Sequence, residues 1–510
     1  MGFEQITINL PTDYTDEQLK SRIAKKLGLK SFTYQIERKS LDARKKSNIH
    51  WQLHIAVAAD ELKGSAPQHA VPLNIPHRRR NKKIVVVGSG PAGFFAASVL
   101  QKAGFQTTLL ERGTEVDVRA RDIDRFERTG QFSPLSNYAF GEGGAGTFSD
   151  GKLTARSVST TAEKDFMIAS YIQAGAPAEI SYMAHPHVGS DNLRVVVKNL
   201  RAAFQRDGGI FHFETLLQDL IVRDGVVQQL VTANGAIEAD ELLIACGHSA
   251  YETYRLLIRR GVLFRPKNFA IGSRVEHPQV LINRGQWGRE RLPGVKAAEY
   301  RLTCRLAGRP VYTFCMCPGG MVVPATAYAD ANIVNGMSLY PRADQFANAA
   351  CVAGVHPDEL LGRESSAADA LDYVSDLERR FYDYSGYKAP SCSIRDFLTQ
   401  REPSQTSGSS YPLGLEPAAL WRMLPAVVID AMRAGLEEFS KKLPGYESGM
   451  LIGLESKTSA PIQVVRERHG LCTGFANLYL VGEGSGWAGG IISSGVDGIR
   501  AAMAIIGRHQ

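Results

Sequence analysis

A glycine-rich turn between a buried strand and a helix constrains this chain more than any other stretch. Residues 84–87 form a continuous apolar run, which predicts a strand buried on both faces of a parallel sheet, and residues 94–103 predict a helix. The turn between them reads G-x-G-x-x-G, whose glycines allow a tight turn, the approach of a pyrophosphate and close helix packing. We expect the pyrophosphate at the helix N-terminus, contacted by Gly88, Gly90, Pro91, Ala92 and Gly93.

A second predicted strand, residues 107–110, supports the same interpretation because it ends in an acid. Glu111 stands where this fold uses a carboxylate to bind a ribose 2′-hydroxyl, and Arg112 follows it. Strand, glycine turn, helix, second strand and acid together predict a Rossmann-type nucleotide-binding domain of the α/β class. Glu111 and Arg112 are therefore expected to contact the cofactor.

The C-terminal region indicates which nucleotide is bound. Residues 477–481 predict another apolar strand, six glycines lie between Gly482 and Gly495, and a helix follows. This arrangement is similar to FAD-binding flavoproteins of the glutathione-reductase type, in which the acid after the strand holds the ribityl chain. The helix N-terminus there faces the flavin N1/O2 edge, where negative charge develops on reduction. The similarity implies non-covalent FAD, contacted by Gly482, Glu483, Gly489, Gly490 and Ile491.

A dense group of glycines in residues 137–153 predicts backbone folded tightly around a ligand. Phe140 and Phe148 interrupt the group, which favours a cofactor-lining loop over a flexible one. A later strand, from residue 241, ends in Cys246, interpreted as a small buried residue. The expected cofactor contacts from these two regions are Gly143, Gly144, Ala145, Gly146, Thr147, Lys152 and Gly247, with Lys152 near a phosphate or the substrate.

The chain divides into five predicted segments. Residues 1–62 predict a small β-α-β-β module and residues 63–82 a linker. The FAD-binding domain is expected in two parts, residues 83–258 and 450–510. Between them, residues 259–449 mix strands, helices and a Ser-rich loop at 404–410, which is typical of an inserted α+β substrate or cap domain.

Charge is concentrated in the first segments. Residues 1–83 hold 16 Lys and Arg against 8 Asp and Glu. The formal net charge of the whole chain is +7, so nearly all of the basic excess lies in these residues. The basic residues at 38–46 and 78–80 suit either a nucleic-acid or acidic-partner surface or a solvated docking face. We favour the docking face because RNA-stacking aromatics are not evident.

Other features bound the location of the protein. No run approaches the roughly 18 apolar residues of a membrane span, and the N-terminus does not resemble a secretory signal. Seven scattered cysteines favour a reducing compartment over a disulfide framework, so we expect a cytoplasmic protein. The oligomeric state is left open.

The motifs together resemble a known family. Residues 141–153, 315–320 (Cys-Met-Cys-Pro-Gly-Gly), 482–484 and 489–491, with residues 40–45 near the N-terminus, resemble the FAD-dependent dehydrogenases or oxidoreductases of bacteria and plant plastids. The resemblance runs end to end and implies FAD and redox chemistry. It supplies no substrate. Small departures occur at positions 456–457, 485 and 487.

Two cysteines and several histidines are the candidate catalytic residues. If residues 314–317 form a regular strand, Cys315 and Cys317 share a face with Cα atoms about 6.5–7 Å apart, at the outer limit for a disulfide. They are interpreted as a redox or substrate-binding pair or as packing residues, and no metal site is expected. His277, preceded by Arg274 and Glu276, is a candidate acid or base, as are His248 and His187.

Two hypotheses about function follow. The first is an FAD-dependent dehydrogenase or reductase that transfers a hydride between FAD and a small organic substrate. The alternative is a flavoprotein that acts on RNA or a protein partner docked by the basic N-terminal module, and a flavin monooxygenase is a further variant. Only one strand–G-x-G-x-x-G–helix unit is present, so NAD(P)H, where it serves as electron donor, is expected to bind transiently in the substrate cleft.

Overall fold

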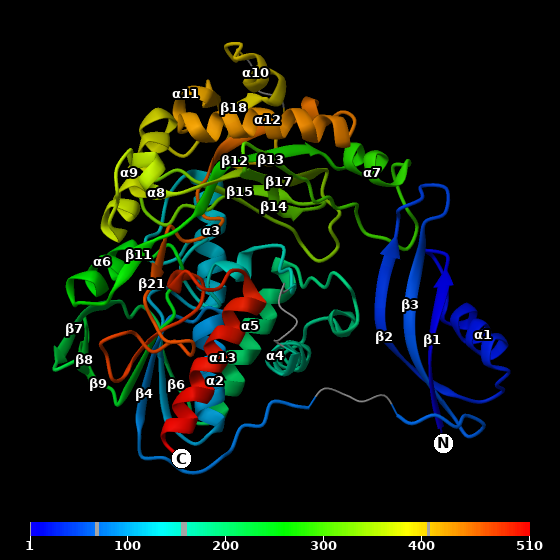
Figure 1. Ribbon diagram of the computed structural model, residues 1–510, viewed down its shortest axis with the longest axis horizontal. Helices are drawn as coiled ribbons and strands as arrows, with labels where there is room; N and C mark the ends of the chain where they lie inside the picture. The colour runs from blue at the N-terminus through cyan, green and yellow to red at the C-terminus, as the bar shows by residue number, and fades with distance from the viewer. Residues whose placement is uncertain (1, 67–70, 155–160, 405–407) are drawn as a thin grey trace.

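In the computed structural model, a five-stranded parallel sheet forms the centre of the part that is predicted to bind a nucleotide (Figure 1). Its strands, in spatial order, are β22 (Leu478–Leu480), β10 (Glu241–Ile244), β4 (Lys83–Val87), β5 (Gln106–Leu110) and β6 (Ile210–His212). The strand predicted at residues 84–87 is therefore the middle strand. Ile84 and Val86 pack in one core, and Val85 and Val87 in another, which explains a run that is apolar at every position.

The two faces of this sheet are covered differently. On one side α2 and α13 pack against each other, with α4 and α5 beside them. The other side carries α6 and a three-stranded antiparallel meander. The bounds are α2 (Pro91–Lys102), α3 (Val116–Thr129), α4 (Thr161–Gln173), α5 (Ser190–Arg206), α6 (Tyr251–Arg259), α13 (Ile491–Arg508), β7 (Leu217–Arg223), β8 (Val226–Thr232) and β9 (Gly235–Glu238).

A seven-stranded sheet, antiparallel except for its last pair, builds the second domain. Its strands, in spatial order, are β13 (Thr303–Leu306), β14 (Arg309–Cys317), β17 (Phe346–Val355), β12 (Phe269–Pro278), β20 (Met450–Glu455), β18 (Ala389–Ser393) and β19 (Leu415–Pro417). β20 pairs with both β12 and β18, so the sequence division after residue 449 cuts through this sheet. The five-residue apolar run at 450–454 signals a buried strand, but it does not say which sheet the strand joins.

Helices cover the outer face of the seven-stranded sheet, with α12 lying across it at the top of Figure 1. Two short two-stranded ribbons, β11 with β21 and β15 with β16, complete the domain. The bounds are α7 (Gln279–Trp287), α8 (Pro357–Leu361), α9 (Ala367–Ser385), α10 (Ile394–Thr399), α11 (Leu420–Met423), α12 (Ala426–Lys442), β11 (Phe264–Pro266), β21 (Ile462–Val464), β15 (Met321–Pro324) and β16 (Val334–Met337).

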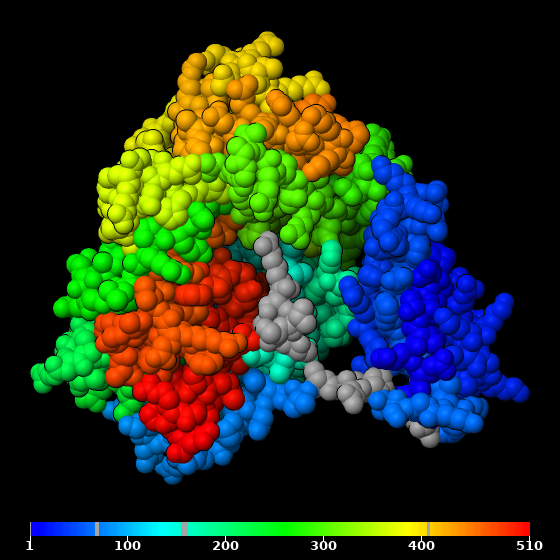
Figure 2. Space-filling model, viewed as in Figure 1, coloured from blue at the N-terminus to red at the C-terminus, as the bar shows by residue number. Residues whose placement is uncertain are grey.

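The N-terminal segment folds in the order β-α-β-β, as its pattern predicts. An antiparallel sheet of order β1-β3-β2 carries one helix, and Ile6, Ile8 and Leu10 face that helix in a separate core. Thr15 and Gln18 form a reciprocal capping box at the helix start. The elements are β1 (Gly2–Leu10), α1 (Asp16–Leu27), β2 (Thr33–Asp42) and β3 (His50–Ala59). This module stands at one edge of the molecule (Figure 2).

The structure describes residues 2–66, 71–154, 161–404 and 408–510. Residues 67–70 of the predicted linker and 405–407 of the predicted Ser-rich loop lie outside these ranges. Among the described helices, none combines the length and the apolar character that a bilayer crossing requires. The described Cys, His, Asp and Glu side chains form no group of three or more that could hold a metal ion.

The position of β4 leads to a stability prediction. Ile84 is fully buried in the middle of the parallel sheet, so Ile84→Ala should lower the free energy of unfolding by about 2–5 kcal/mol. Ile210 in the edge strand β6 is 52% exposed, so Ile210→Ala should change the free energy of unfolding by less than about 0.5 kcal/mol. Urea unfolding of both variants measures the difference. Equal losses would contradict the central place of β4.

Candidate active site

One buried arginine holds the glycine-rich loop in place. Arg119 of α3 is completely buried, and its guanidinium donates hydrogen bonds to five backbone carbonyls of the loop. Burial lowers the pKa of Arg119 to about 10, against the attraction of Glu111 and Glu142. The acceptors are the carbonyls of Asn137 (2.9 Å), Tyr138 (3.1 Å), Gly141 (3.2 Å), Glu142 (2.8 Å) and Gly144 (2.9 Å).

The loop then passes the first turns of two helices. A Cβ added to Gly144 would lie 3.0 Å from the Cα of Gly90, at the start of α2. A Cβ added to Gly146 would lie 3.1 Å from Cγ1 of Ile491, the first residue of α13. The loop therefore connects the two helix N-termini, and the strip of backbone from Gly90 along the loop to Ile491 is called the cradle below.

Both helix N-termini have room for a ligand. Neither Gly90 nor Gly490 caps its helix through a side chain, so the first N–H groups of α2 and α13 lack a side-chain acceptor. A Cβ on Gly90 would meet only the Cα of Gly144, at 3.8 Å, and one on Gly490 would meet no atom within 4 Å. Gly90 has φ −64°, which any residue adopts. Its backbone therefore does not require glycine.

The two predicted ribose and ribityl acids differ in availability. Glu483 is partly buried beside Gly489, and the described part of the chain offers its carboxylate no hydrogen-bond donor. Glu111 is 4% exposed and accepts four hydrogen bonds: from Ser89 N (3.0 Å), Ser89 Oγ (2.6 Å), Gly113 N (2.9 Å) and Gly141 N (3.1 Å). These donors occupy both of its oxygens, so a ribose hydroxyl would have to replace the Ser89 hydroxyl. Glu111 also ties the turn to the loop.

Arg112 and the remaining predicted cofactor residues line the same edge of the sheet. The guanidinium of Arg112 lies 3.7 Å from the ring centre of Phe140 and pairs with Glu252. Gly143 N–H donates to Ser89 Oγ at 3.3 Å. Gly247 and Gly482 follow the neighbouring strands β10 and β22, a few residues after their carboxyl ends. The structure thus gathers these residues at the carboxyl end of the parallel strands.

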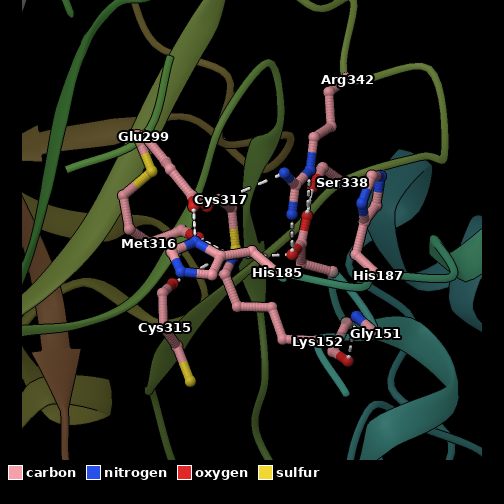
Figure 3. A network of polar contacts seen from close by, with 12 residues as sticks. Gly151, Lys152, His185, His187, Glu299, Cys315, Met316, Cys317, Ser338 and Arg342 are labelled. Atoms are coloured by element: carbon pink, nitrogen blue, oxygen red, sulfur yellow. Dashed lines mark hydrogen bonds and ion pairs between the residues drawn. The ribbon is translucent and has the colours of Figure 1, made fainter. Parts of the chain in front are cut away.

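Beyond the cradle, the loop ends in an ionic network with the second domain (Figure 3). Asp150 accepts hydrogen bonds from Arg342 Nε (3.0 Å), Arg342 Nη2 (2.6 Å), Lys152 Nζ (2.6 Å) and the hydroxyl of Ser338. Lys152 also donates to the carbonyl of Met316. Burial opposes ionisation of Asp150, but attraction to Lys152 and Arg342 outweighs it, so its pKa lies well below the ordinary value.

Two histidines and a glutamate extend this network. Glu299 Oε1 lies 2.5 Å from His185 Nδ1, and Glu299 Oε2 lies 3.8 Å from Arg342 Nη1. The hydrogen bond to Glu299 raises the pKa of His185. Although burial opposes ionisation of Glu299, its positive neighbours lower its pKa to about 2. His187 hydrogen-bonds the carbonyl of Tyr340 (3.1 Å), and burial lowers its pKa to about 4.

The cysteine pair does not have the geometry expected of a regular strand. The register of β14 shifts between Phe314 and Cys317, and Cys315 has φ +42°. Cys315 is exposed and its sulfur points away from the network, whereas Cys317 is buried with Sγ 3.5 Å from Arg274 Nη2 (Figure 3). Both thiols are free. The expectation that they share a face is wrong, because the bulge turns one of them over.

The two candidate histidines are placed differently. His277 is completely buried on the face of β12 opposite Arg274, with Nε2 2.7 Å from the carbonyl of Tyr446 and a pKa that burial lowers to about 4. His248 follows the carboxyl end of β10 and is partly buried. Its Nε2 lies 2.7 Å from the carbonyl of Lys457 and its Nδ1 3.2 Å from Ser249 Oγ.

Several residues of the predicted basic surface contact the protein itself. Arg80 is 6% exposed and donates to the carbonyls of Ala103 and His509. The Lys39 ammonium lies over the rings of Tyr14 (4.9 Å) and Trp51 (4.6 Å). Arg44 pairs with Asp42. These contacts favour the docking interpretation over a surface for nucleic acid.

Three family models match parts of the chain. They are described as FAD-dependent protein, C-terminal domain-like (residues 268–458), FAD binding domain (residues 81–125) and a domain of unknown function (residues 3–58). A protein from Clostridium beijerinckii, described as uncharacterized, is 38% identical over 98% of this chain and 97% of its own length.

Solved structures that resemble the chain do so weakly. CtdE in complex with FAD is 12% identical over 84% of this chain and 85% of its own, with a TM-score of 0.35. Tetracycline destructase Tet(51) is 12% identical over 84% and 83%, with a TM-score of 0.36. L-proline dehydrogenase from P. horikoshii is 11% identical over 85% and 95%, also with a TM-score of 0.36. At such scores these resemblances carry no weight for function.

Arg119 generates a prediction about the loop. Arg119→Met removes the donor from five buried carbonyls, each of which costs about 1–3 kcal/mol when left unpaired, so the variant should lose more than about 3 kcal/mol of stability. Arg121→Met changes an exposed arginine of the same helix and should have little effect. Thermal unfolding compares the two. Similar midpoints would show that the loop does not depend on Arg119.

Proposed function

We propose that this chain, which belongs to the family of FAD-dependent proteins that includes the Clostridium beijerinckii relative, is an oxidoreductase that transfers a hydride between non-covalent FAD and a small organic substrate. One observation carries the proposal: a single loop passes two uncapped helix N-termini and ends at a charged junction with the second domain. A cofactor in the cradle would meet a substrate at that junction.

The chain's own groups fit the parts of FAD. The N–H groups at the start of α2 suit the pyrophosphate, and the positive end of α13 suits a flavin edge that gains negative charge. Glu483, whose carboxylate lacks a donor from the described residues, suits the hydroxyls of the ribityl chain. The adenosine side would be held at Glu111 and Arg112. On this basis we assign the residues that the sequence predicts as cofactor contacts to the binding of FAD.

Bound FAD supplies a two-electron carrier for the hydride, and the chain positions the substrate and handles the proton. Oxidation of a C–H beside an O–H or N–H would give up a hydride to that carrier and would leave one proton for a base of the chain. The carbonyl of Lys457 can only accept, so His248 donates from Nε2 and its Nδ1 is an acceptor. We assign proton acceptance to His248 Nδ1, next to the Ser249 hydroxyl.

The other candidate residues have different proposed roles. Cys315 presents an exposed thiol from its bulge and is proposed to line the substrate side. Cys317 is proposed to keep Arg274 in place, because its sulfur lies beside that guanidinium. His277, buried in the core of the second domain, is proposed to support the fold instead of touching the substrate.

We propose that a nicotinamide, where it serves as donor, enters the substrate cleft transiently. Within the described ranges, one sheet contains three or more successive parallel strands, and it is the sheet already assigned to FAD. Steady-state kinetics with NADPH and a reducible substrate as electron acceptor should show ping-pong or competitive behaviour. Simultaneous binding of both at separate sites, seen by calorimetry, would exclude it.

The reaction is tested by anaerobic reduction. Purified protein should carry FAD that is released on denaturation, and a panel of alcohols, hydroxy acids, amines, NADH and NADPH should include a compound that bleaches its visible absorbance. Rapid re-oxidation coupled to oxygen insertion into the product would favour a monooxygenase instead. A protein that takes up no FAD on reconstitution would refute the proposal at its base.

Gly90 gives a sharper prediction. Gly90→Val should abolish FAD retention, because its side chain would occupy the space of the pyrophosphate, while the protein itself has room for it. Gly408→Val places the same side chain in open space on a loop and should retain FAD fully. Bound flavin per protein is read from absorbance after gel filtration. A Gly90→Val protein that folds and keeps full FAD occupancy would rule out this pyrophosphate site.

A further inference from the structure

The N-terminal module contacts the rest of the protein through its edge strand β2. Lys39 N–H of β2 donates to the carbonyl of Tyr182 at 2.8 Å, and Ala184 N–H donates to the carbonyl of Lys39 at 2.9 Å. This forms a parallel bridge with residue 183. The side chain of Met183 packs into the core of the module. Residues 182–184 are thus added to the module's sheet.

A second segment, residues 294–295, also packs closely against the module. Val295 also packs into the core of the module. Its neighbour Gly294 has φ +72°, and a Cβ there would lie 1.9 Å from the carbonyl oxygen of Thr12. Only glycine allows this approach, so the module and the segment around residue 294 fit each other at backbone level.

Both gripped segments run directly into the ionic network. His185 follows Ala184, and Glu299 lies four residues after Val295; their side chains meet at 2.5 Å. The next residues, 186–189, pair with the end of the glycine-rich loop: Leu153 N–H donates to Pro186 O (2.9 Å), and Val188 N–H donates to Gly151 O (3.0 Å). One continuous chain of backbone contacts therefore leads from β2 to residues 151–153, at the end of the glycine-rich loop.

We infer that the module of residues 2–62 is a positioning element for the active site: its grip on residues 182–184 and 294–295 brings His185 and Glu299 together as one wall of the substrate-facing network. The inference rests on the proposed function, which makes this network the substrate side of the flavin. The inference gives the module a specific role beyond that of a docking domain. Met183 and Val295 are the positioning residues.

The ionisation of His185 reports this role directly. Its ring faces Glu299, Lys152 and Arg342, and the hydrogen bond to Glu299 raises its pKa. If the two segments separate, we expect that hydrogen bond to break and the contacts of Arg119 with the glycine-rich loop to remain. A merely stabilising module would not change the titration of this one ring.

The test compares two double variants of the full chain. Met183→Asp/Val295→Asp places charges in the contact with the module. Leu263→Asp/Val280→Asp is the control, because both residues are exposed (53% and 38%) and belong to the second domain. Ring-labelled histidine is titrated by NMR, with His185→Gln to assign the signal. Hydrogen exchange at the amide of Ala184 shows whether the contact has opened.

In the contact variant, we expect faster exchange at Ala184, a His185 midpoint that falls toward its ordinary value of about 6.5, and undiminished FAD content. If Ala184 stays protected, Gly294→Val forces the contact apart and is scored in its place. Two outcomes would overturn the inference. One is an open contact at Ala184 with an unchanged titration midpoint of His185, and the other is loss of FAD when the contact opens. Failure of every substrate to reduce the flavin would refute the proposed function but leave this result standing.

Discussion

The guanidinium of Arg119 is the interaction on which the site depends. Glycines give the loop of residues 137–153 its tight course, but they provide no side chains to hold it. A single buried cation does so by collecting five carbonyls, and the nearby Glu111 and Glu142 balance its charge. Because Glu111 also accepts from Ser89 and Gly141, the loop and the nucleotide-binding turn are fixed as one unit. The cradle is therefore held together by contacts within the protein itself.

Arg119 holds the middle of the glycine-rich loop, and charged residues join the end of the loop to the second domain. Asp150 bridges the loop to Arg342 of the second domain, and Lys152 reaches the backbone beside the Cys315 bulge. Among the described residues, Arg342 and Cys315 are two of the six non-glycine residues with positive φ, so part of the backbone strain lies where the domains meet. The N-terminal module adds the last support through β2, which explains its close fit to the body of the protein.

Local patterns predicted the nucleotide-binding part well, because its determinants are contiguous: an apolar strand, a glycine turn and a capped or uncapped helix start. The FAD-dependent family was likewise recognisable and is confirmed by the relative and the family models. The network was not predictable. Lys152 was singled out because it follows the glycine motif, and Asp150 beside it could have been. Arg342 and Glu299 lie in unremarkable sequence and meet them only through tertiary folding. The Cys315 bulge was missed because alternation assumes an unbroken strand.

A crystal structure of the protein with FAD bound tests the central claim most directly. The account predicts the pyrophosphate against the first N–H groups of α2, the flavin N1/O2 edge at the start of α13, and the far side of the ring facing the Lys152 end of the loop. The five hydrogen bonds of Arg119 should be unchanged. FAD bound elsewhere, or a loop that leaves Arg119 to admit the cofactor, would contradict the account.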